Sequence, residues 1–210
     1  MIQNAENTKS IHVEYVSANP TGPLHIGHGR GMILGEVTAK FLSYQGHKII
    51  REYYVNDAGR QIALLLVRVL LCHLGKNKHV FIDEMSSDNG HLVTYKGNYV
   101  NDVASSLSNH LEKFDKDLVL KLLSQPIDSL ISFLKKHKSY FEIRKALVNV
   151  IIDEYIKEDL SVVGINFDSW FRESQLYETG LLDEVLLNIK NKNLSYSKDG
   201  ALWFKNTQFG

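Results

Sequence analysis

Cysteine, proline and net charge are all scarce in this chain of 210 residues, which has one cysteine and three prolines. A single cysteine excludes an internal disulfide and any zinc site built from several cysteines, and it fits a reducing compartment. The charges cancel, because 24 Lys and Arg residues stand against 24 Asp and Glu residues. No overall field therefore draws the chain to a nucleic acid, so any RNA contact must come from local patches.

Long apolar runs are missing as well. The opening residues MIQNAENTKS are polar and lack the apolar segment of a signal peptide. The most apolar stretch, residues 62–74, is too short to span a bilayer and contains Arg68. We therefore expect a cytoplasmic protein that has no membrane partner.

The order of the apolar segments near the N-terminus indicates the fold class. Residues 11–16 and 48–55 are rich in β-branched and aromatic side chains, as strands are, and residues 34, 37, 41 and 44 between them are apolar at helical spacing. A strand, a crossover helix and a second strand form a βαβ unit, in which the strands are parallel. The sequence therefore predicts an α/β fold with a Rossmann-like parallel sheet.

The composition of the sequence changes after Gly75, where we expect an apolar helix to end. Residues 76–140 contain polar runs, scattered lysines and one modest helix through residues 103–111, which indicates an α-rich insertion with a thinner core. Residues 141–163 predict a long helix, and residues 165–171 a further strand. We expect Thr179 to cap another helix, and the Asp199-Gly200 pair to form the turn of a hairpin.

These segments divide the chain into three predicted parts. Residues 1–75 form the first half of the Rossmann-like domain, residues 76–140 the insertion, and residues 141–210 a return to the first domain through helices and a hairpin. A doubly wound domain that binds a nucleotide usually needs about five parallel strands. The sequence supplies only one clear βαβ unit, so we expect the fold to be incomplete and the chain to be a truncated half of a larger domain.

The segment ANPTGPLHIGH, residues 18–28, is the strongest functional signal. Pro20 and Pro23 restrict the backbone, and Gly22 permits a tight turn before the helix starts. The first turn of a helix offers unpaired N–H groups to an anion, and His25 and His28 lie on one face of that turn. A lone His-x-x-His is more often a pair of surface histidines, but the preceding strand and turn favour a phosphate site.

The residues His25-Ile26-Gly27-His28 resemble the HIGH motif of class I aminoacyl-tRNA synthetases. The longer strings VEYVSANPTGPLHIGHGRG (residues 13–31) and IREYYVNDAGRQI (residues 50–62) are similar to the arginyl-tRNA synthetases in particular, and so is YKGNY at residues 95–99. The resemblance covers nearly the whole chain. It implies the N-terminal half of a class I catalytic domain, which in the family continues into a KMSKS-equivalent loop and a helical anticodon-binding domain.

The resemblance also implies a reaction. Family members join L-arginine to ATP as arginyl-adenylate and then transfer the arginine to the terminal ribose of tRNA(Arg). By this resemblance, His25 and His28 are catalytic and contact the ATP phosphates, with Mg²⁺ as the counterion of the nucleotide and no protein-bound zinc. We expect the full-length protein to be a monomer. The nucleotide-binding residues that we expect are Pro23, His25, Gly27, His28 and Arg30.

Gly27 is assigned to the space under the adenine or ribose, and Arg30 to a phosphate or the substrate carboxylate, although a basic residue in a first turn is as often simply solvated. A carboxylate on Glu14 suits the ammonium group of a cationic amino acid, and Asn19 offers both a donor and an acceptor. The arginine-binding residues that we expect are Glu14, Ser17, Asn19, Asp57 and Gln61.

Simpler interpretations of these residues stay open at this stage. Glu14 fits an exposed carboxylate at a strand end, Asn19 a turn former, and Asp57 the cap of the helix that follows.

Two other functions compete with a synthetase. The first is a nucleotidyltransferase of the same HIGH-type superfamily, which forms an adenylate or dinucleotide without tRNA. The second is a non-catalytic folding unit or interaction module that keeps the turn but lacks the partner half. For the isolated chain, the sequence predicts weak ATP binding and no aminoacylation.

Overall fold

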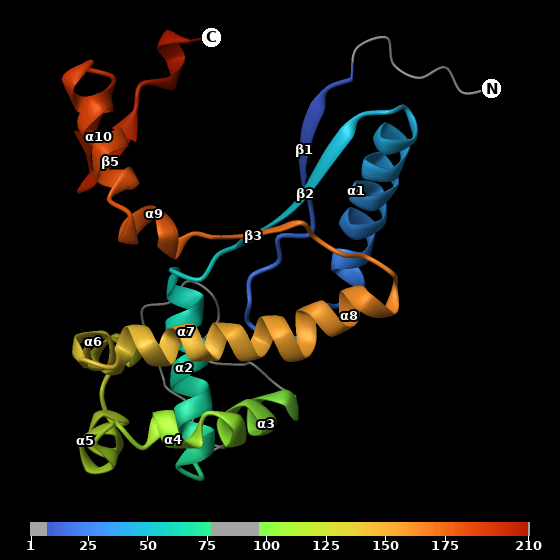
Figure 1. The fold of residues 1–210 in the computed structure, drawn as a ribbon. Coiled ribbons are helices and arrows are strands. Elements are labelled where there is room, and N and C mark those ends of the chain that lie inside the picture. Colours follow the sequence, from blue (N-terminus) through green and yellow to red (C-terminus); the bar gives the residue numbers. More distant parts are fainter. Residues whose placement is uncertain (1–7, 77–96, 210) are drawn as a thin grey trace. The chain divides into compact units, whose positions relative to one another are not determined.

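The computed structural model describes residues 8–76 and 97–209. Its N-terminal part is a βαβ unit of β1 (Ser10–Glu14), α1 (Ile26–Tyr44) and β2 (Lys48–Val55), shown in Figure 1. The two strands are parallel, with Ser10 opposite Lys48 and Glu14 opposite Glu52. A third strand, β3 (Ser169–Arg172), gives a sheet in the order β1-β2-β3. This confirms the predicted α/β fold with a parallel sheet.

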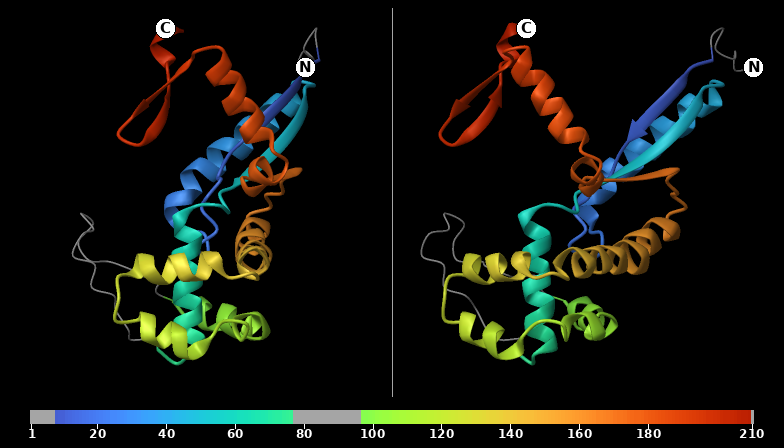
Figure 2. Two further views of the ribbon diagram at one scale, coloured as in Figure 1. Left: turned by 90° about the vertical axis from the view of Figure 1, so that its left-hand side faces the viewer. Right: turned by 60° about the vertical axis from the view of Figure 1, so that its left-hand side comes forward.

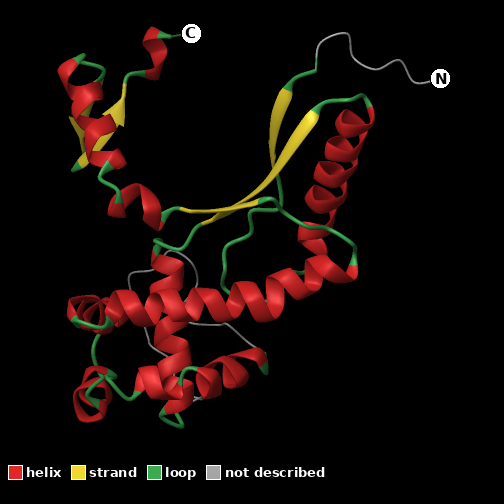
Figure 3. Cartoon of the chain, in the orientation of Figure 1, coloured by secondary structure: helices red, strands yellow, loops and turns green. Residues whose placement is uncertain are grey.

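Helices make up most of the structure between the second and third strands, as Figure 3 shows. Helix α2 packs against α3, α6 and α7. The segments α7, η1 and α8 run as one rod (Figure 2), in which η1 is a π-helical turn. These elements are α2 (Arg60–His73), α3 (Tyr99–Ser106), α4 (Ser108–Leu111), α5 (Lys116–Leu122), α6 (Ile127–Lys136), α7 (Tyr140–Ile151), η1 (Ile152–Ile156) and α8 (Lys157–Val162).

The prediction that the insertion has a thin core is wrong for the part of it that the structure describes. Helix α6 alone contributes three fully buried side chains, Ile127, Leu130 and Leu134, which belong to the same apolar core as Leu66 of α2 and Leu147 of α7. The short helices place an apolar residue inward at every third or fourth position and their lysines outward. The average polarity of the segment therefore concealed a regular buried face. The polar run at residues 86–90 and residues 95–96 lie outside the described residues.

A second compact unit begins at Arg172 and is described by itself. It contains α9 (Ser174–Glu178), α10 (Leu181–Asn191), β4 (Ser195–Lys198), β5 (Ala201–Phe204) and the 3-10 turn η2 (Asn206–Gln208). Strands β4 and β5 form the predicted hairpin, and Asp199 and Gly200 both have positive φ angles, of 51° and 75°. The prediction that Thr179 caps this helix is wrong, because the N-cap residue of α10 is Gly180. The φ angle of Gly180 is 72°, a conformation that favours a residue without a side chain.

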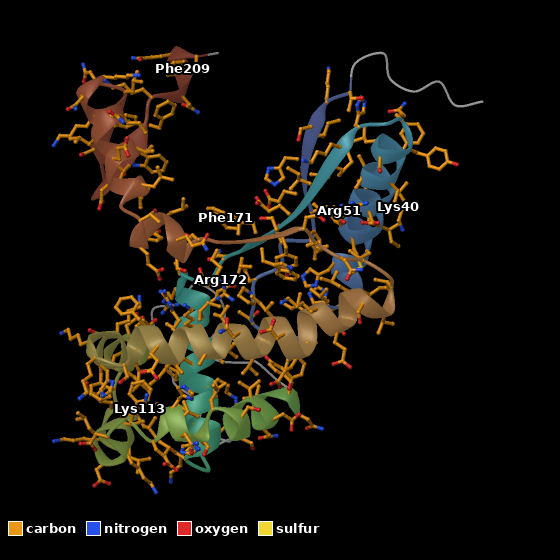
Figure 4. All side chains as sticks on the ribbon, in the orientation of Figure 1. Lys40, Arg51, Lys113, Phe171, Arg172 and Phe209 are labelled. Atoms are coloured by element: carbon orange, nitrogen blue, oxygen red, sulfur yellow. The ribbon has the colours of Figure 1, made fainter. Side chains whose placement is uncertain are left out.

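Helix α1 is fastened to the sheet through Glu36, which is buried. The Tyr15 hydroxyl donates to Glu36 Oε2 at 2.5 Å, and Lys40 Nζ and Arg51 Nε approach the same carboxylate at 3.3 and 3.2 Å. Figure 4 labels Lys40 on α1 and Arg51 on β2. Burial by itself would raise the pKa of Glu36, but the hydrogen bond from Tyr15 and the two cations outweigh it and lower that pKa.

The close approach of α1 to the sheet also depends on Gly35. A Cβ atom added to Gly35 would overlap the Tyr15 ring. Burial, followed by the hydrogen bond to Glu36, raises the pKa of Tyr15, so its hydroxyl remains a neutral donor. In the part of the chain that the structure describes, no helix combines the length and the hydropathy needed to cross a bilayer.

Two glycines of α1 provide a matched test of this packing. Gly35→Ala forces a methyl group into the Tyr15 ring and should lower the free energy of unfolding by about 1–3 kcal/mol. Gly31→Ala meets nothing within 4 Å and should raise it, by up to about 1 kcal/mol, because alanine favours helix. Denaturant unfolding of both variants measures the difference. Equal effects of the two substitutions would contradict the packing described here.

Candidate active site

The N-terminus of α1 is capped by two imidazoles in a reciprocal arrangement. His25 is the N-cap residue, and its Nδ1 accepts a hydrogen bond from the Gly27 N–H at 3.1 Å. The His25 N–H in turn donates to Nδ1 of His28 at 3.2 Å. The two rings stack with their centroids 3.8 Å apart. Such a capping box is usually built from Ser or Thr and Glu, so the two histidines here take over a structural role at the helix start.

This capping pattern decides which ring nitrogen carries the proton. A neutral imidazole has one donor nitrogen and one acceptor nitrogen. Because both Nδ1 atoms accept from the backbone, His25 and His28 each carry their proton on Nε2. Burial, and secondarily the proximity of His25, lowers the pKa of His28. We call the turn and helix start at residues 18–28 the histidine corner. This corner therefore presents two Nε2–H donors at the positive end of the helix dipole, an arrangement suited to phosphate oxygens.

The turn that leads to this helix begins with a strained backbone. Val16 and Ser17 have positive φ angles of 64° and 40°. The Ser17 N–H bonds to the Tyr15 carbonyl at 2.9 Å, which closes a γ-turn around Val16. A β-branched residue rarely adopts this conformation, which persists only where neighbouring contacts hold it. One such contact is the hydrogen bond from the Tyr54 N–H to Ser17 Oγ, at 3.0 Å.

Two tyrosines from other elements hold the middle of the turn. The Tyr53 hydroxyl of β2 donates to the Ala18 carbonyl at 2.9 Å, and the Tyr99 hydroxyl of α3 donates to the Thr21 carbonyl at 2.8 Å. Gly22 lets the Tyr99 ring approach, since an added Cβ would lie 3.0 Å from that ring. Long-range hydrogen bonds therefore help the prolines of this segment to fix the path of its backbone.

A carboxylate of α8 holds the end of the turn. Asp159 Oδ2 accepts from the Leu24 N–H at 2.7 Å. Asp159 follows the π-helical turn η1, and such turns often occur at functional sites. Tyr155, within η1, packs its ring edge-on against Tyr99 at 5.8 Å. The rod of α7, η1 and α8 therefore supports the turn both directly and through Tyr99.

The expected arginine-binding residues follow the carboxyl ends of β1 and β2. Asn19 Nδ2 donates to Gln61 Oε1 at 2.8 Å, so the structure brings these two together. Asp57 is buried immediately after β2. The N-cap residue of α2 is Gly59, which has no side chain to cap that helix. Glu14 is the last residue of β1 and is exposed.

The remaining expected residues lie around the first turns of α1. Pro23 and Arg30 are both exposed. Gly27 is required next to His25, because an added Cβ would lie 2.9 Å from that ring. This is a second reason for glycine there, besides the room for a ligand that the sequence indicates. Within residues 8–76 and 97–209, no group of three or more His, Cys, Asp or Glu side chains is arranged to hold a metal ion.

Sequence reasoning missed three residues that shape this corner: Tyr53, Tyr99 and Asp159. The two tyrosines lie inside strings that resemble the arginyl-tRNA synthetases, so a signal for them existed. Asp159 had no such signal, since 135 residues separate it from Leu24.

Comparison with known proteins identifies the family of the whole chain. A family model described as the catalytic domain of class I (R) tRNA synthetases matches residues 1–210. The arginine–tRNA ligase of Hydrogenovibrio crunogenus is 38% identical over 99% of this chain and 37% of its own length. That of Aquifex aeolicus is 36% identical over 95% of this chain and 36% of its own length. The chain thus spans little more than a third of these relatives.

Solved structures agree with this result. A putative arginyl-tRNA synthetase from Campylobacter jejuni is 29% identical and matches all of this chain and 40% of its own, with a TM-score of 0.67. The arginyl-tRNA synthetase of Thermus thermophilus matches 99% of this chain and 32% of its own, with a TM-score of 0.51 and 18% identity, and so supports the fold alone.

The lowered pKa of His28 leads to a prediction about pH. Its imidazole signal should titrate below pH 6.5, the ordinary value for histidine. Because the folded-state pKa lies below the unfolded one, the stabilisation by neutral His28 is complete above about pH 6.5 and is lost as the pH falls through the folded-state pKa. An NMR titration of the ring protons measures this midpoint. In His25→Ala the midpoint of His28 should rise only part of the way towards pH 6.5, because His28 remains partly buried. A midpoint at or above pH 6.5 in the unaltered chain would contradict the described packing of the two rings.

Proposed function

Because the chain belongs to the family of class I arginyl-tRNA synthetase catalytic domains, we propose that it is part of an arginine–tRNA ligase and that its corner binds the phosphates of ATP. L-arginine and tRNA(Arg) are the other substrates, and Mg²⁺ enters with the nucleotide. The observation that carries the proposal is that His25 and His28 both accept backbone hydrogen bonds through Nδ1 at the start of α1, which leaves their Nε2–H groups as donors for a ligand. The proposed full-length enzyme is a cytoplasmic monomer.

In the proposed first step, a carboxylate oxygen of arginine attacks the α-phosphorus of ATP. The bond from that phosphorus to the bridging oxygen breaks, and pyrophosphate leaves. Negative charge grows on the phosphate oxygens, where the two imidazole donors and the helix dipole stabilise it. Removing one such donor typically raises the barrier by about 3 kcal/mol. In the second step a hydroxyl of the terminal ribose of tRNA attacks the arginyl carbonyl, and AMP leaves.

The nucleotide group of this proposal consists of Pro23, His25, Gly27, His28 and Arg30. The two histidines are held at the helix start by their capping bonds, so they need no rearrangement to receive a phosphate. The exposure of Arg30 leaves its guanidinium accessible to a substrate anion. The proposed parts of the chain are residues 1–75, 76–140 and 141–210, and the two histidines lie in the first of them.

The arginine group consists of Glu14, Ser17, Asn19, Asp57 and Gln61. All five follow or end β1 and β2, and in open α/β sheets ligands bind beyond the carboxyl ends of the strands. The hydrogen bond between Asn19 and Gln61 supports a shared site. The carboxylates of Glu14 and Asp57 provide the negative charge that a cationic amino acid requires.

Calorimetric titration with ATP tests this proposal. The chain should bind ATP weakly but saturably, and the signal should disappear in a His25→Ala, His28→Ala double variant. His25→Asn is the more stringent variant, because asparagine keeps the N-cap but removes the Nε2–H donor, and it too should weaken binding. A control with His73→Ala and His110→Ala should bind as the unaltered chain does, and circular dichroism confirms that each variant is folded.

The same material separates the competing functions. ATP–pyrophosphate exchange without tRNA would favour a nucleotidyltransferase, and the absence of ATP binding would favour a non-catalytic folding unit. The chain alone should not arginylate tRNA(Arg), because it spans only about 37% of the length of a related ligase. Arginylation by the isolated chain would contradict that expectation.

A further inference from the structure

Five cations gather where α6 ends and α7 begins. Residues 135–145 contain five Lys or Arg residues and one acid, although the whole chain carries equal numbers of the two kinds. Four of the five are exposed, and the fifth is half-buried. We call this set the α6–α7 patch: Lys135, Lys136, Lys138, Arg144 and Lys145. Since the chain has no net charge, an attraction for a polyanion must come from a local patch of this kind.

The α6–α7 patch has no acidic partner among the described residues. The one acid of this stretch, Glu142, is engaged by other cations: its Oε1 accepts a hydrogen bond from Lys113 Nζ at 2.7 Å, and His110 Nε2 lies 3.8 Å away. Figure 4 labels Lys113. Over residues 8–76 and 97–209, no ion pair joins any of the five cations to a carboxylate. The positive charge of the patch is therefore left for a partner outside this part of the chain.

Helix stability explains only two of these cations. Lys135 and Lys136 lie in the last turn of α6, where positive charge interacts favourably with the helix dipole. Lys138 directly precedes Ser139, the N-cap of α7, and positive charge is unfavourable at that end of a helix. Like charges this close also repel one another. A bound anion would offset both costs, so the placement of Lys138 indicates a ligand.

An exposed aromatic ring lies among the cations. Phe141 of α7 is 65% exposed, and the guanidinium carbon of Arg144 lies 5.2 Å from the centre of its ring. Surfaces that bind RNA combine cations that contact phosphates with aromatic and arginine side chains on which unpaired bases stack. The patch therefore fits RNA better than a carboxylate-rich protein, which offers the ring no base to stack on.

The position of the patch on the helical rod sets the size of the ligand. Arg144 and Lys145 lie 14–15 residues before Asp159 in the continuous rod of α7, η1 and α8. At a rise of 1.5 Å per residue, about 20 Å separates them from Asp159. Asp159 accepts a hydrogen bond from the Leu24 N–H, within the histidine corner. A ligand that reaches from the corner to the patch is therefore a polymer and not a single amino acid.

We infer, resting on the proposed function, that the α6–α7 patch binds the phosphate backbone of the tRNA arm that carries the 3′ end. In the proposed reaction the terminal ribose of this arm is brought to the histidine corner, and the arm then extends over the distance to the patch. Lys138 and Lys145 contact phosphates, and Phe141 stacks on an unpaired base.

Binding of RNA by the whole chain tests this inference without ATP. The probes are a labelled hairpin of the 3′-end arm of tRNA(Arg) and a labelled hairpin of its anticodon arm, and fluorescence anisotropy measures the affinity at several salt concentrations. The chain should bind the first hairpin more tightly than the second. The double variant Lys138→Glu, Lys145→Glu should weaken binding of the first at least about ten-fold. It should also reduce the slope of log affinity against log salt by about 1–2, because each lysine contacts a phosphate.

The matched control is the double variant Lys190→Glu, Lys192→Glu, which makes the same charge change on exposed lysines at the end of α10. It should leave the affinity within about two-fold, because distant charges are screened by salt. Lys138→Arg, Lys145→Arg should keep the affinity of the unaltered chain, since it keeps both charges. Glutamate before α7 suits the helix dipole, so the patch variant should fold, which circular dichroism verifies.

Four results would overturn the inference: no binding of the 3′-end hairpin, an affinity that the patch variant leaves unchanged, an equal loss in the α10 control, or an anticodon hairpin bound as tightly as the first. Vesicles that contain phosphatidylserine are a further probe. If they bind, the hairpins do not, and the patch variant releases the vesicles, the surface is a membrane site instead. ATP titration of the unaltered chain is a separate measurement, so ATP binding without hairpin binding contradicts this inference and not the proposed nucleotide site.

Discussion

The left-handed backbone at Val16 and Ser17 is the constraint on which the rest of the site depends. Such a conformation costs on the order of 1–3 kcal/mol per residue, so it survives only where other bonds hold it in place. Hydrogen bonds that Tyr53 and Tyr99 donate, and one that Asp159 accepts from the Leu24 N–H, hold the turn that follows, and each typically contributes about 0.5–3 kcal/mol. These residues belong to β2, α3 and α8, so the turn is stable only when the sheet and the helical unit are both folded.

The consequence of this constraint is a helix start that is ready for an anion. Once the turn places His25 before α1, the two imidazoles cap the helix with their Nδ1 atoms, and only the Nε2–H donors remain for a ligand. Structure and proposed chemistry therefore use different nitrogens of the same rings. The low pKa of His28 keeps that ring neutral and its capping nitrogen unprotonated near neutral pH.

The sequence predicts the local elements of this structure, but it does not predict the contacts between residues far apart in the chain. The βαβ unit, the hairpin at Asp199-Gly200 and the histidine corner follow from periodicity and turn residues within short windows. The bond from Leu24 to Asp159 does not, because nothing local links residues 135 apart. Helix α1 shows the same limit: helical spacing predicts an amphipathic helix, but not that Val37 and Phe41 stay exposed while Gly35 packs on Tyr15.

In the proposed site, His25 and His28 use Nδ1 for the helix and offer Nε2–H to phosphate. Long-range nitrogen-15 NMR spectra of the histidine rings near neutral pH test it most directly. Both rings should have an unprotonated Nδ1 and a protonated Nε2 before any ligand is added, and added ATP should shift the Nε2 signals. A proton on Nδ1 of either ring, or Nε2 signals that stay unmoved at saturating ATP, would contradict it.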